Sequence, residues 1–218
     1  GAGPAGLMAA LVADQRGHKV TLFEKDAQLG GQLNMARVIP GKEEFHGLVA
    51  WFETMVGKSN IDLRLNTQAA AETLTGFDEV IIATGVVPRD PGIPGEDGPN
   101  VLSYIDVLRR GAEVGPRVAV VGAGGIGFDV SEFVTQQGES ATLNLEHWKT
   151  EWGGGEGGPR LLEVDTIVLC AGQEPLRDLA DALAGTGTPV HVIGGADVAA
   201  ELDAKRAIDQ GARLAASL

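Results

Sequence analysis

Three glycines open the chain, and their spacing matches a turn that binds the pyrophosphate of a dinucleotide. In the stretch GAGPAG, Gly1 would allow a tight bend, Gly3 would let the backbone approach the ligand, and Gly6 would let the following helix pack closely on a strand. Glu24 lies 18 positions after Gly6, near the roughly 20 positions expected for an acid that hydrogen-bonds ribose hydroxyls. We therefore predict a dinucleotide site held by backbone amides and one carboxylate.

A second glycine turn occurs in RVAVVGAGGIG, where Gly122, Gly124 and Gly127 repeat the same spacing. Residues 117–121 predict a short buried strand before this turn, and a helix of about ten residues is predicted after it. The first turn has no strand before it, because it begins at Gly1. We therefore expect the chain to lack the residues that lead into the first turn.

The two turns begin two copies of one plan. Each turn is followed later by an acidic residue, an apolar strand and a small residue with glycine, in FDEVIIATG and VDTIVLCAG. From the turn to this last glycine there are 84 positions in the first copy (Gly1 to Gly85) and 50 in the second (Gly122 to Gly172). Either residues are missing near 153–158 or the second copy is degenerate, and we favour missing residues.

The segments between these landmarks predict the elements that position them. A helix follows the first turn and ends at Gly17, and KVTLFEK then forms a strand that presents Glu24. Residues 42–56 have the apolar spacing of an amphipathic helix, and we assign its phenylalanines to the core. Residues 190–193 predict a strand that leads into Gly194 and Gly195, with a helix from about Val198. The alternation of strands and helices indicates the α/β class.

Two further stretches carry residues that are able to contact a ligand. The pair Gly30–Gly31 allows the backbone to lie close to a ligand, and Gln32 can hydrogen-bond a ring or ribitol edge; the alternative is a plain loop turn. Asp197 is placed to cap the helix predicted from about Val198. It would also be able to hydrogen-bond the ribitol chain of a flavin, and the two roles are compatible.

Composition argues against several other classes of function. The formal charge is −13, from 17 Lys and Arg against 30 Asp and Glu, which disfavours nucleic acid and anionic membranes as partners. No apolar run approaches the roughly 20 residues of a membrane span, and no signal peptide is visible.

Cys170 is the only cysteine and lies in the apolar run TIVLCAG, so we predict a buried structural thiol. We predict no catalytic side chain and no metal ligand, and a structural role for the four histidines, His18, His46, His147 and His191.

The order of the specific sequence blocks resembles a known family. The two-copy plan resembles the two-dinucleotide-binding flavoproteins of the glutathione-reductase type. GGQLNMARVIPGKEEF, FDEVIIATGVVPR, VLSYIDVLR, VAVVGAGGIGFDV, CAGQEP and IGGADVAAELDAKRAIDQG together resemble the C-terminal part of the bacterial 2,4-dienoyl-CoA reductases. These belong with trimethylamine dehydrogenase and the Old Yellow Enzyme-type flavoproteins. The likeness covers nearly the whole chain.

This resemblance implies the cofactors and the domains. An FAD-binding domain would comprise 1–85 and 173–218, and an NAD(P)-binding domain 86–172, with a segment missing near 153–158. The family adds an FMN barrel and a four-cysteine iron–sulfur cluster outside this chain, a nicotinamide nucleotide as electron donor, a role in fatty acid β-oxidation and a cytoplasmic location. The residues that would hold FAD are Gly1, Gly3, Gly6, Glu24, Gly31, Gln32, Thr84, Gly85, Gly195 and Asp197. Gly122, Gly124 and Gly127 would bind the pyrophosphate of NADP or NAD.

Two functions from different classes remain open on the sequence. The chain is an electron-input region that passes reducing equivalents from NAD(P)H through FAD toward the iron–sulfur cluster and FMN, or it is a non-redox domain that binds ADP, as the resemblance to trimethylamine dehydrogenase-like proteins implies. A disulfide reductase is excluded, because its chemistry needs a pair of cysteines and the chain has one. A flavin monooxygenase is compatible with the glycine turns but has no support from the specific blocks.

Overall fold

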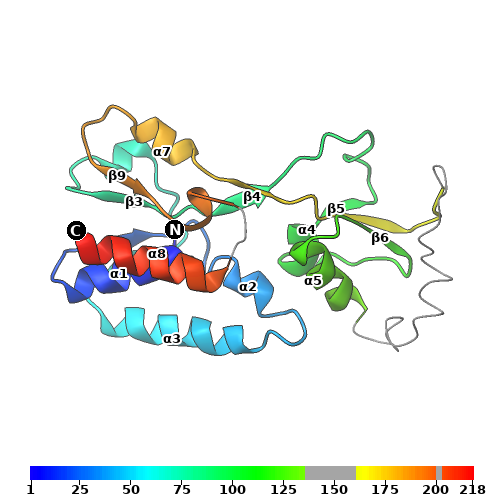
Figure 1. Ribbon diagram of the computed structural model, residues 1–218, viewed down its shortest axis with the longest axis horizontal. Helices are drawn as coiled ribbons and strands as arrows, with labels where there is room; N and C mark the ends of the chain where they lie inside the picture. The colour runs from blue at the N-terminus through cyan, green and yellow to red at the C-terminus, as the bar shows by residue number, and fades with distance from the viewer. Residues whose placement is uncertain (136–160, 200–202) are drawn as a thin grey trace. The chain divides into compact units, whose positions relative to one another are not determined.

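The chain forms two compact units in the computed structural model, which describes residues 1–135, 161–199 and 203–218 (Figure 1). Unit 1 comprises Gly1–Val38, Lys42–Asp90 and Gly172–Leu218, and unit 2 comprises Ile39–Gly41 and Pro91–Ala171. Both units mix helices with mostly parallel strands, which confirms the predicted α/β class. The predicted gap near 153–158 lies outside the described residues.

Unit 1 consists of short strand pairs flanked by three long helices. Strands β1 and β2 pair in parallel, as do β3 and β9, whereas β4 and β8 pair antiparallel. The strands are β1 Thr21–Phe23, β2 Asp62–Arg64, β3 Val80–Ile82, β4 Val86–Pro88, β8 Gln173–Pro175 and β9 Val190–Val192. The helices are α1 Pro4–Gln15, α2 Leu33–Ala36, α3 Glu44–Lys58, α7 Asp178–Leu183 and α8 Ala204–Ser217, with 3₁₀ turns η1 at Ala71–Leu74 and η3 at Gly194–Ala196.

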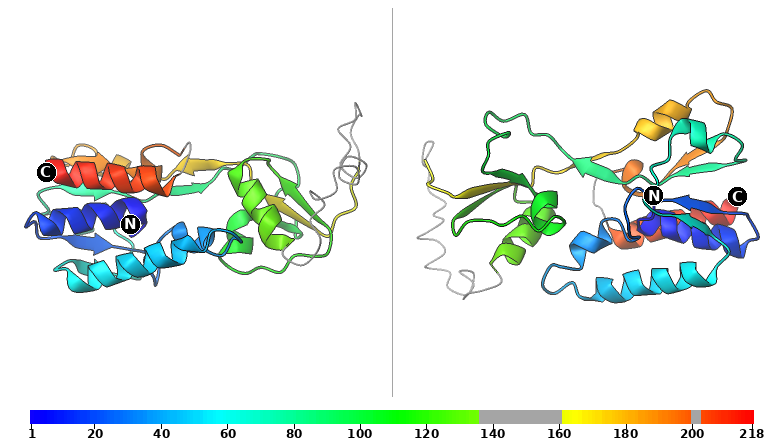
Figure 2. Two further views of the ribbon diagram at one scale, coloured as in Figure 1. Left: turned by 60° about the horizontal axis from the view of Figure 1, so that its bottom comes forward. Right: turned by 180° about the vertical axis from the view of Figure 1, so that it is seen from behind.

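Helix α1 forms where the sequence predicts it and packs closely on α8. Pro4 occupies its first position, where the missing N–H removes no intrahelical hydrogen bond, and Gly17 ends the helical run with a φ of 92°. The two helices lie side by side (Figures 1 and 2). A Cβ atom built on Gly211 of α8 would lie 2.3 Å from the carbonyl oxygen of Ala5, so this close approach requires glycine.

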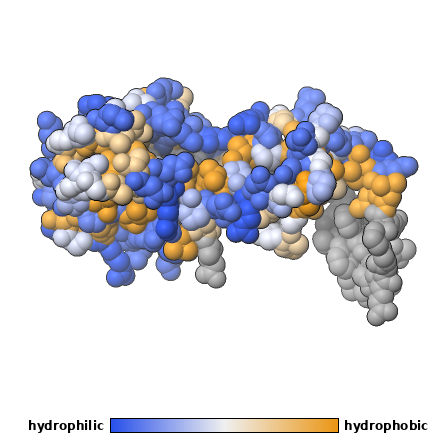
Figure 3. Space-filling model, turned by 90° about the horizontal axis from the view of Figure 1, so that it is seen from above, coloured by the Kyte–Doolittle hydropathy of each residue, from blue (hydrophilic) through white to orange (hydrophobic). Residues whose placement is uncertain are grey.

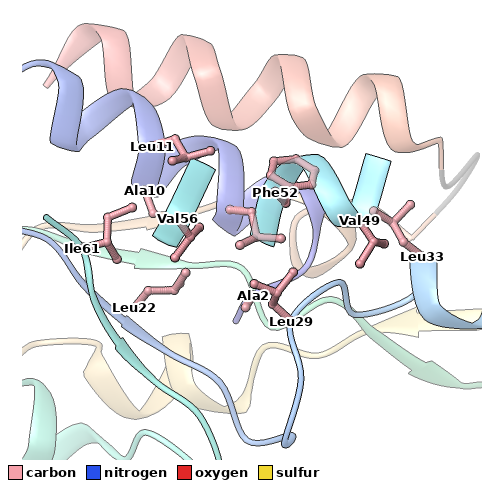
Figure 4. Close-up of a cluster of buried hydrophobic side chains, with 11 residues drawn as sticks. Ala2, Ala10, Leu11, Leu22, Leu29, Leu33, Val49, Phe52, Val56 and Ile61 are labelled. Carbon is pink, nitrogen blue, oxygen red and sulfur yellow. The ribbon is translucent and has the colours of Figure 1, made fainter. Parts of the chain in front are cut away.

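The main hydrophobic core of unit 1 lies between α1, α3 and β1 (Figure 4). Phe52 of α3 is fully buried in it, in contact with side chains from the other elements. Burial of one such side chain contributes about 2–3 kcal/mol relative to exposure. The predicted core role of the α3 phenylalanines is therefore confirmed for Phe52, and Phe45 packs against the same cluster while partly exposed.

The start of the last helix was predicted wrongly. Helix α8 begins at Ala204 and not near Val198, and the side chain of Asp203 caps it by accepting a hydrogen bond of 2.9 Å from the Lys205 N–H. Asp197 instead follows the 3₁₀ turn η3, and its Oδ2 accepts a hydrogen bond from Gln210. Asp197 therefore does not cap this helix, because it lies seven positions before Ala204.

Unit 2 contains a three-stranded parallel sheet in the order β5–β7–β6. Its described strands are β5 Val101–Ser103, β6 Val118–Val121 and β7 Thr166–Leu169, and its described helices are α4 Tyr104–Leu108 and α5 Gly125–Val134. Strand β6 and the ten-residue helix α5 flank the second glycine turn, as the sequence predicts. Ser103 and Asp106 begin α4 with reciprocal hydrogen bonds, and the bond from the Ser103 hydroxyl lowers the pKa of Asp106.

Among the described residues, no helix is long and apolar enough to cross a membrane. On the face drawn in Figure 3, hydrophobic residues lie in small areas among hydrophilic ones. Among the described aromatic side chains, Phe128 of α5 is the most exposed, at 70%.

Cys170, which follows β7, is buried as predicted. Burial raises the pKa of its thiol from 9.0 to about 11. The folded state thus favours the protonated thiol, and this contribution to stability is present below about pH 9 and lost as the pH rises toward 11.

At pH 8 we expect iodoacetamide to label Cys170 at least about tenfold more slowly in the folded chain than in guanidinium, because the thiolate is the nucleophile. Peptide mass spectrometry measures both rates, and equal rates would contradict this assignment.

Candidate dinucleotide-binding turns

The first and third glycines of the first turn are required by the packing of the protein itself. A Cβ atom built on Gly1 would lie 2.4 Å from the carbonyl oxygen of Ala83, the residue after β3. One built on Gly6 would lie 2.0 Å from the carbonyl oxygen of Gly1. Contacts under 3.0 Å are not tolerated between these atoms, so a side chain at Gly1 would push the turn away from Ala83, and one at Gly6 would push α1 away from Gly1.

No packing contact within the protein requires glycine at the middle position, Gly3. A Cβ atom built on Gly3 would meet nothing within 4 Å, and its backbone, with φ −78° and ψ 177°, suits any residue. Gly3 is the N-cap of α1, and no side chain there satisfies the first N–H groups of the helix. A helix N-terminus of this kind favours phosphate. Open space at Gly3 beside this N-terminus fits the pyrophosphate of a dinucleotide.

Glu24 lies directly beside the first turn. It is buried, with 6% exposure, and its Oε2 accepts a hydrogen bond of 2.6 Å from the Ala2 N–H while its Oε1 accepts one of 2.9 Å from the Asp26 N–H. These two bonds fix the carboxylate against the turn. An ionised carboxylate accepts about four hydrogen bonds, so the two backbone bonds do not exhaust its capacity for ribose hydroxyls.

The Gly30–Gly31 pair packs on the same turn. The Gly30 N–H donates a hydrogen bond of 2.8 Å to the Ala2 carbonyl, and a Cβ atom on Gly31, whose φ is 54°, would lie 2.9 Å from the Cα of Gly3. The buried side chain of Asn34 fills the space beside Gly30, and its Nδ2 donates to the Leu29 carbonyl at 2.9 Å. Sequence reasoning did not identify Asn34. Its packing contact is with a residue four positions away, and no ligand-binding pattern marks it.

The residues after β3 are hydrogen-bonded to the residue after β8 in unit 1. The Thr84 hydroxyl donates a hydrogen bond of 2.5 Å to the Leu176 carbonyl, and Gly85, with φ 77°, receives the Leu176 N–H on its own carbonyl. Gly195 lies within η3, directly before the loop that carries Asp197. The Asp197 side chain is 41% exposed and is therefore accessible to a ligand.

A pocket of about 550 Å³ opens beside the β4–β8 pair. Its lining residues are Arg89, Gly172, Gln173, Glu174, Pro175 and Ala199. The Gln173 side chain in this lining extends to 3.4 Å from Oε1 of Gln32, and Arg89 forms an ion pair of 3.4 Å with Glu174. The volume is within the range of pockets that hold a cofactor-sized group. Gln32 is not part of this lining, but its side chain contacts the lining residue Gln173.

The second turn repeats the geometry of the first. A Cβ atom on Gly122, whose φ is 117°, would lie 2.3 Å from the Cys170 carbonyl oxygen, and one on Gly127 would lie 1.9 Å from the Gly122 carbonyl oxygen. A Cβ on Gly124 would again meet nothing within 4 Å, and Gly124 is the uncapped N-cap of α5. Both units therefore present a helix N-terminus with open space at the middle glycine, and each is suited to a phosphate group.

The part of the sequence that contains both glycine turns matches a known protein family. The family model described as pyridine nucleotide-disulphide oxidoreductase matches residues 1–148. Cinnamate reductase of Clostridium sporogenes is 39% identical over 145 residues, covering 66% of this chain and 22% of that protein. NADH oxidase of Thermoanaerobacter brockii is 36% identical over 149 residues, covering 66% of this chain and 23% of that protein. The chain thus spans less than a quarter of the length of these two relatives.

A solved structure extends the likeness to the whole chain. The complex of 2-naphthoyl-CoA reductase with 2-naphthoyl-CoA superposes with a TM-score of 0.86 at 25% identity, covering 100% of this chain and 39% of that one. Together with the family model, this confirms the predicted Rossmann-like dinucleotide-binding fold.

Proposed function

Because the chain belongs to the pyridine nucleotide-disulphide oxidoreductase family, we propose that it is the FAD-containing electron-input region of a flavoprotein oxidoreductase similar to 2,4-dienoyl-CoA reductase. In this proposal NAD(P)H delivers reducing equivalents that pass through FAD to an iron–sulfur cluster and FMN outside the chain. The observation that carries the proposal is the pair of glycine turns, each open at its middle glycine and closed at the other two.

Different residues of unit 1 would bind different parts of FAD. Gly3 and the N-terminus of α1 would bind the pyrophosphate, while Glu24, already fixed by two backbone amides, would orient the adenosine ribose. Gly31 would let its backbone lie close to Gly3, and Gln32 would contact the ring or ribitol edge. Thr84, Gly85 and Gly195 would shape the loops along the rest of the cofactor, and Asp197 would accept a hydrogen bond from the ribitol chain.

The chemistry itself would come from the cofactors. FAD, when bound, accepts a hydride from a nicotinamide nucleotide and releases single electrons, so no side chain of this chain needs to act as an acid or a base. Gly122, Gly124 and Gly127 would place the nicotinamide nucleotide in unit 2. Our choice of NADP over NAD, the cytoplasmic location and the role in fatty acid β-oxidation rest on the family resemblance.

The relatives support a substrate class for the whole protein. One solved structure is a reductase in complex with an aromatic acyl-CoA, and one relative is named a reductase of cinnamate. We therefore propose that the electrons are used to reduce an unsaturated acyl-CoA bound outside this chain. The alternative remains a domain that binds ADP without redox chemistry, since the contacts of the first turn and Glu24 would serve the ADP part of either ligand.

Titration of the purified chain with FAD and with ADP separates the two functions. If the flavin half is bound, FAD should bind one to one and at least about tenfold more tightly than ADP, because ribitol and ring contacts add to those of the diphosphate. Calorimetry measures both affinities. Equal affinity for FAD and ADP would favour the non-redox domain, and no binding of either would overturn both proposals.

A further inference from the structure

The side chain of Gln210, in the middle of α8, holds the loop that carries Asp197. Its Oε1 accepts a hydrogen bond of 2.8 Å from the Gly194 N–H, and its Nε2 donates one of 2.8 Å to Oδ2 of Asp197. We propose that Gln210 is a positioning residue for FAD, which sets the orientation of the Asp197 carboxylate toward the ribitol chain. The inference rests on the proposed function, because it assigns a role within that FAD site.

Arg177 holds the same loop from the other side. Its Nε donates a hydrogen bond of 2.8 Å to the Ala196 carbonyl, and its Nη2 donates to the Asp197 carbonyl. The Asp197 Oδ1 lies 3.8 Å from this Nη2, so the two carboxylate oxygens have different partners. With Oδ2 bound by an uncharged donor and the side chain 41% exposed, the carboxylate has a fixed direction and is still able to accept a ligand hydroxyl.

The position of Gln210 is itself fixed relative to the first glycine turn. Its neighbour Gly211 packs against the Ala5 carbonyl, where a Cβ atom would lie 2.3 Å away, and Ala5 belongs to the first turn of α1. A Cβ atom on Gly194 would likewise lie 2.9 Å from the Cβ of Ala5. Gln210 therefore connects the Asp197 loop to the helix N-terminus that would bind the pyrophosphate.

This arrangement makes a specific prediction about selectivity. Asp197 would contact the ribitol, which FAD has and ADP lacks, whereas the first turn would contact the diphosphate that both ligands share. Loss of the Gln210 contacts should therefore weaken FAD binding and leave ADP binding unchanged. A merely structural role in supporting α8 would weaken both ligands together.

Two substitutions at Gln210 and one matched control test the proposal by calorimetry. Gln210→Met keeps the length of the side chain but removes both hydrogen bonds, and we expect roughly a tenfold loss of FAD affinity from the lost bond to a charged group. Gln210→Glu retains an acceptor for the Gly194 N–H but repels Asp197, so it should weaken FAD at least as much. Asp209→Asn alters only an exposed ion pair with Arg213 on the same helix and should bind FAD like the parent chain.

A double-mutant cycle shows whether Gln210 acts through Asp197. In an Asp197→Ala background, Gln210→Met should cause no further loss of FAD affinity, because the group that it orients is gone. Equal FAD affinity of Gln210→Met and the parent chain, a parallel loss of ADP affinity, or additive losses in the cycle would each overturn the inference. Failure of the parent chain to bind FAD at all would instead overturn the proposed function.

Discussion

Replacing Gly3 with valine should strongly weaken FAD binding while the chain stays folded. A Cβ atom at Gly3 would meet nothing within 4 Å and the backbone there is extended, so we expect the free energy of unfolding to change by less than about 1 kcal/mol. The added methyl groups would occupy the space that the pyrophosphate needs, and the FAD dissociation constant should rise by roughly a hundredfold or more, about 2.7 kcal/mol. Calorimetry and urea unfolding measure the two quantities.

The matched control is Gly6→Ala in the same turn. Its Cβ atom would lie 2.0 Å from the Gly1 carbonyl oxygen, so this smaller substitution should destabilise the fold by about 1–3 kcal/mol. The contrast separates ligand binding from packing: the larger side chain at Gly3 is tolerated by the protein and the smaller one at Gly6 is not. Valine at Gly3 with undiminished FAD affinity would show that no phosphate lies there.

Replacing Gly124 with valine should remove reduction by the nicotinamide nucleotide and leave FAD in place. A Cβ atom at this middle glycine of the second turn would also meet no protein atom within 4 Å, and Gly124 lies in unit 2, whereas the proposed FAD residues lie in unit 1. We expect normal flavin content and at least roughly a hundredfold slower flavin reduction by NADPH at subsaturating concentration, because the pyrophosphate can no longer approach the backbone. Anaerobic stopped-flow absorbance measures the rate.

Two outcomes would contradict the assignment of FAD to unit 1 and of the nicotinamide nucleotide to unit 2. If Gly124→Val lost its flavin, the second turn would be serving the FAD site. If the variant were reduced as fast as the parent chain, the nicotinamide nucleotide would bind elsewhere. Chemical reduction by dithionite should proceed normally in both proteins and shows that the flavin itself remains reducible.

Much of the fold could be predicted because its signals are local. The spacing of Gly1, Gly3 and Gly6 defines a turn within six residues, Pro4 and Gly17 mark the ends of α1, and the alternation in KVTLFEK identifies β1 and places Glu24 just after it. The second turn, β6 and α5 follow from the same short patterns. The internal repeat then indicates two dinucleotide-binding units without knowledge of any long-range contact.

The features that sequence reasoning missed depend on contacts that no local pattern encodes. Asp197 and Asp203 are both suitable N-caps before a helical stretch, and no local pattern shows that the helix begins directly after Asp203. The Asp197 carboxylate instead accepts a hydrogen bond from Gln210, 13 positions later. Thr84 has its partner Leu176 92 positions away along the chain. Arg177 donates hydrogen bonds to the loop carbonyls of Ala196 and Asp197, 19 and 20 positions away.

Anaerobic mixing of the FAD-loaded chain with NADPH tests the central claim most directly. If this chain receives reducing equivalents from a nicotinamide nucleotide through FAD, the visible absorption of the oxidised flavin should bleach in proportion to the NADPH added. Flavin that stays oxidised in excess NADPH and excess NADH, yet is bleached at once by dithionite, would contradict the account.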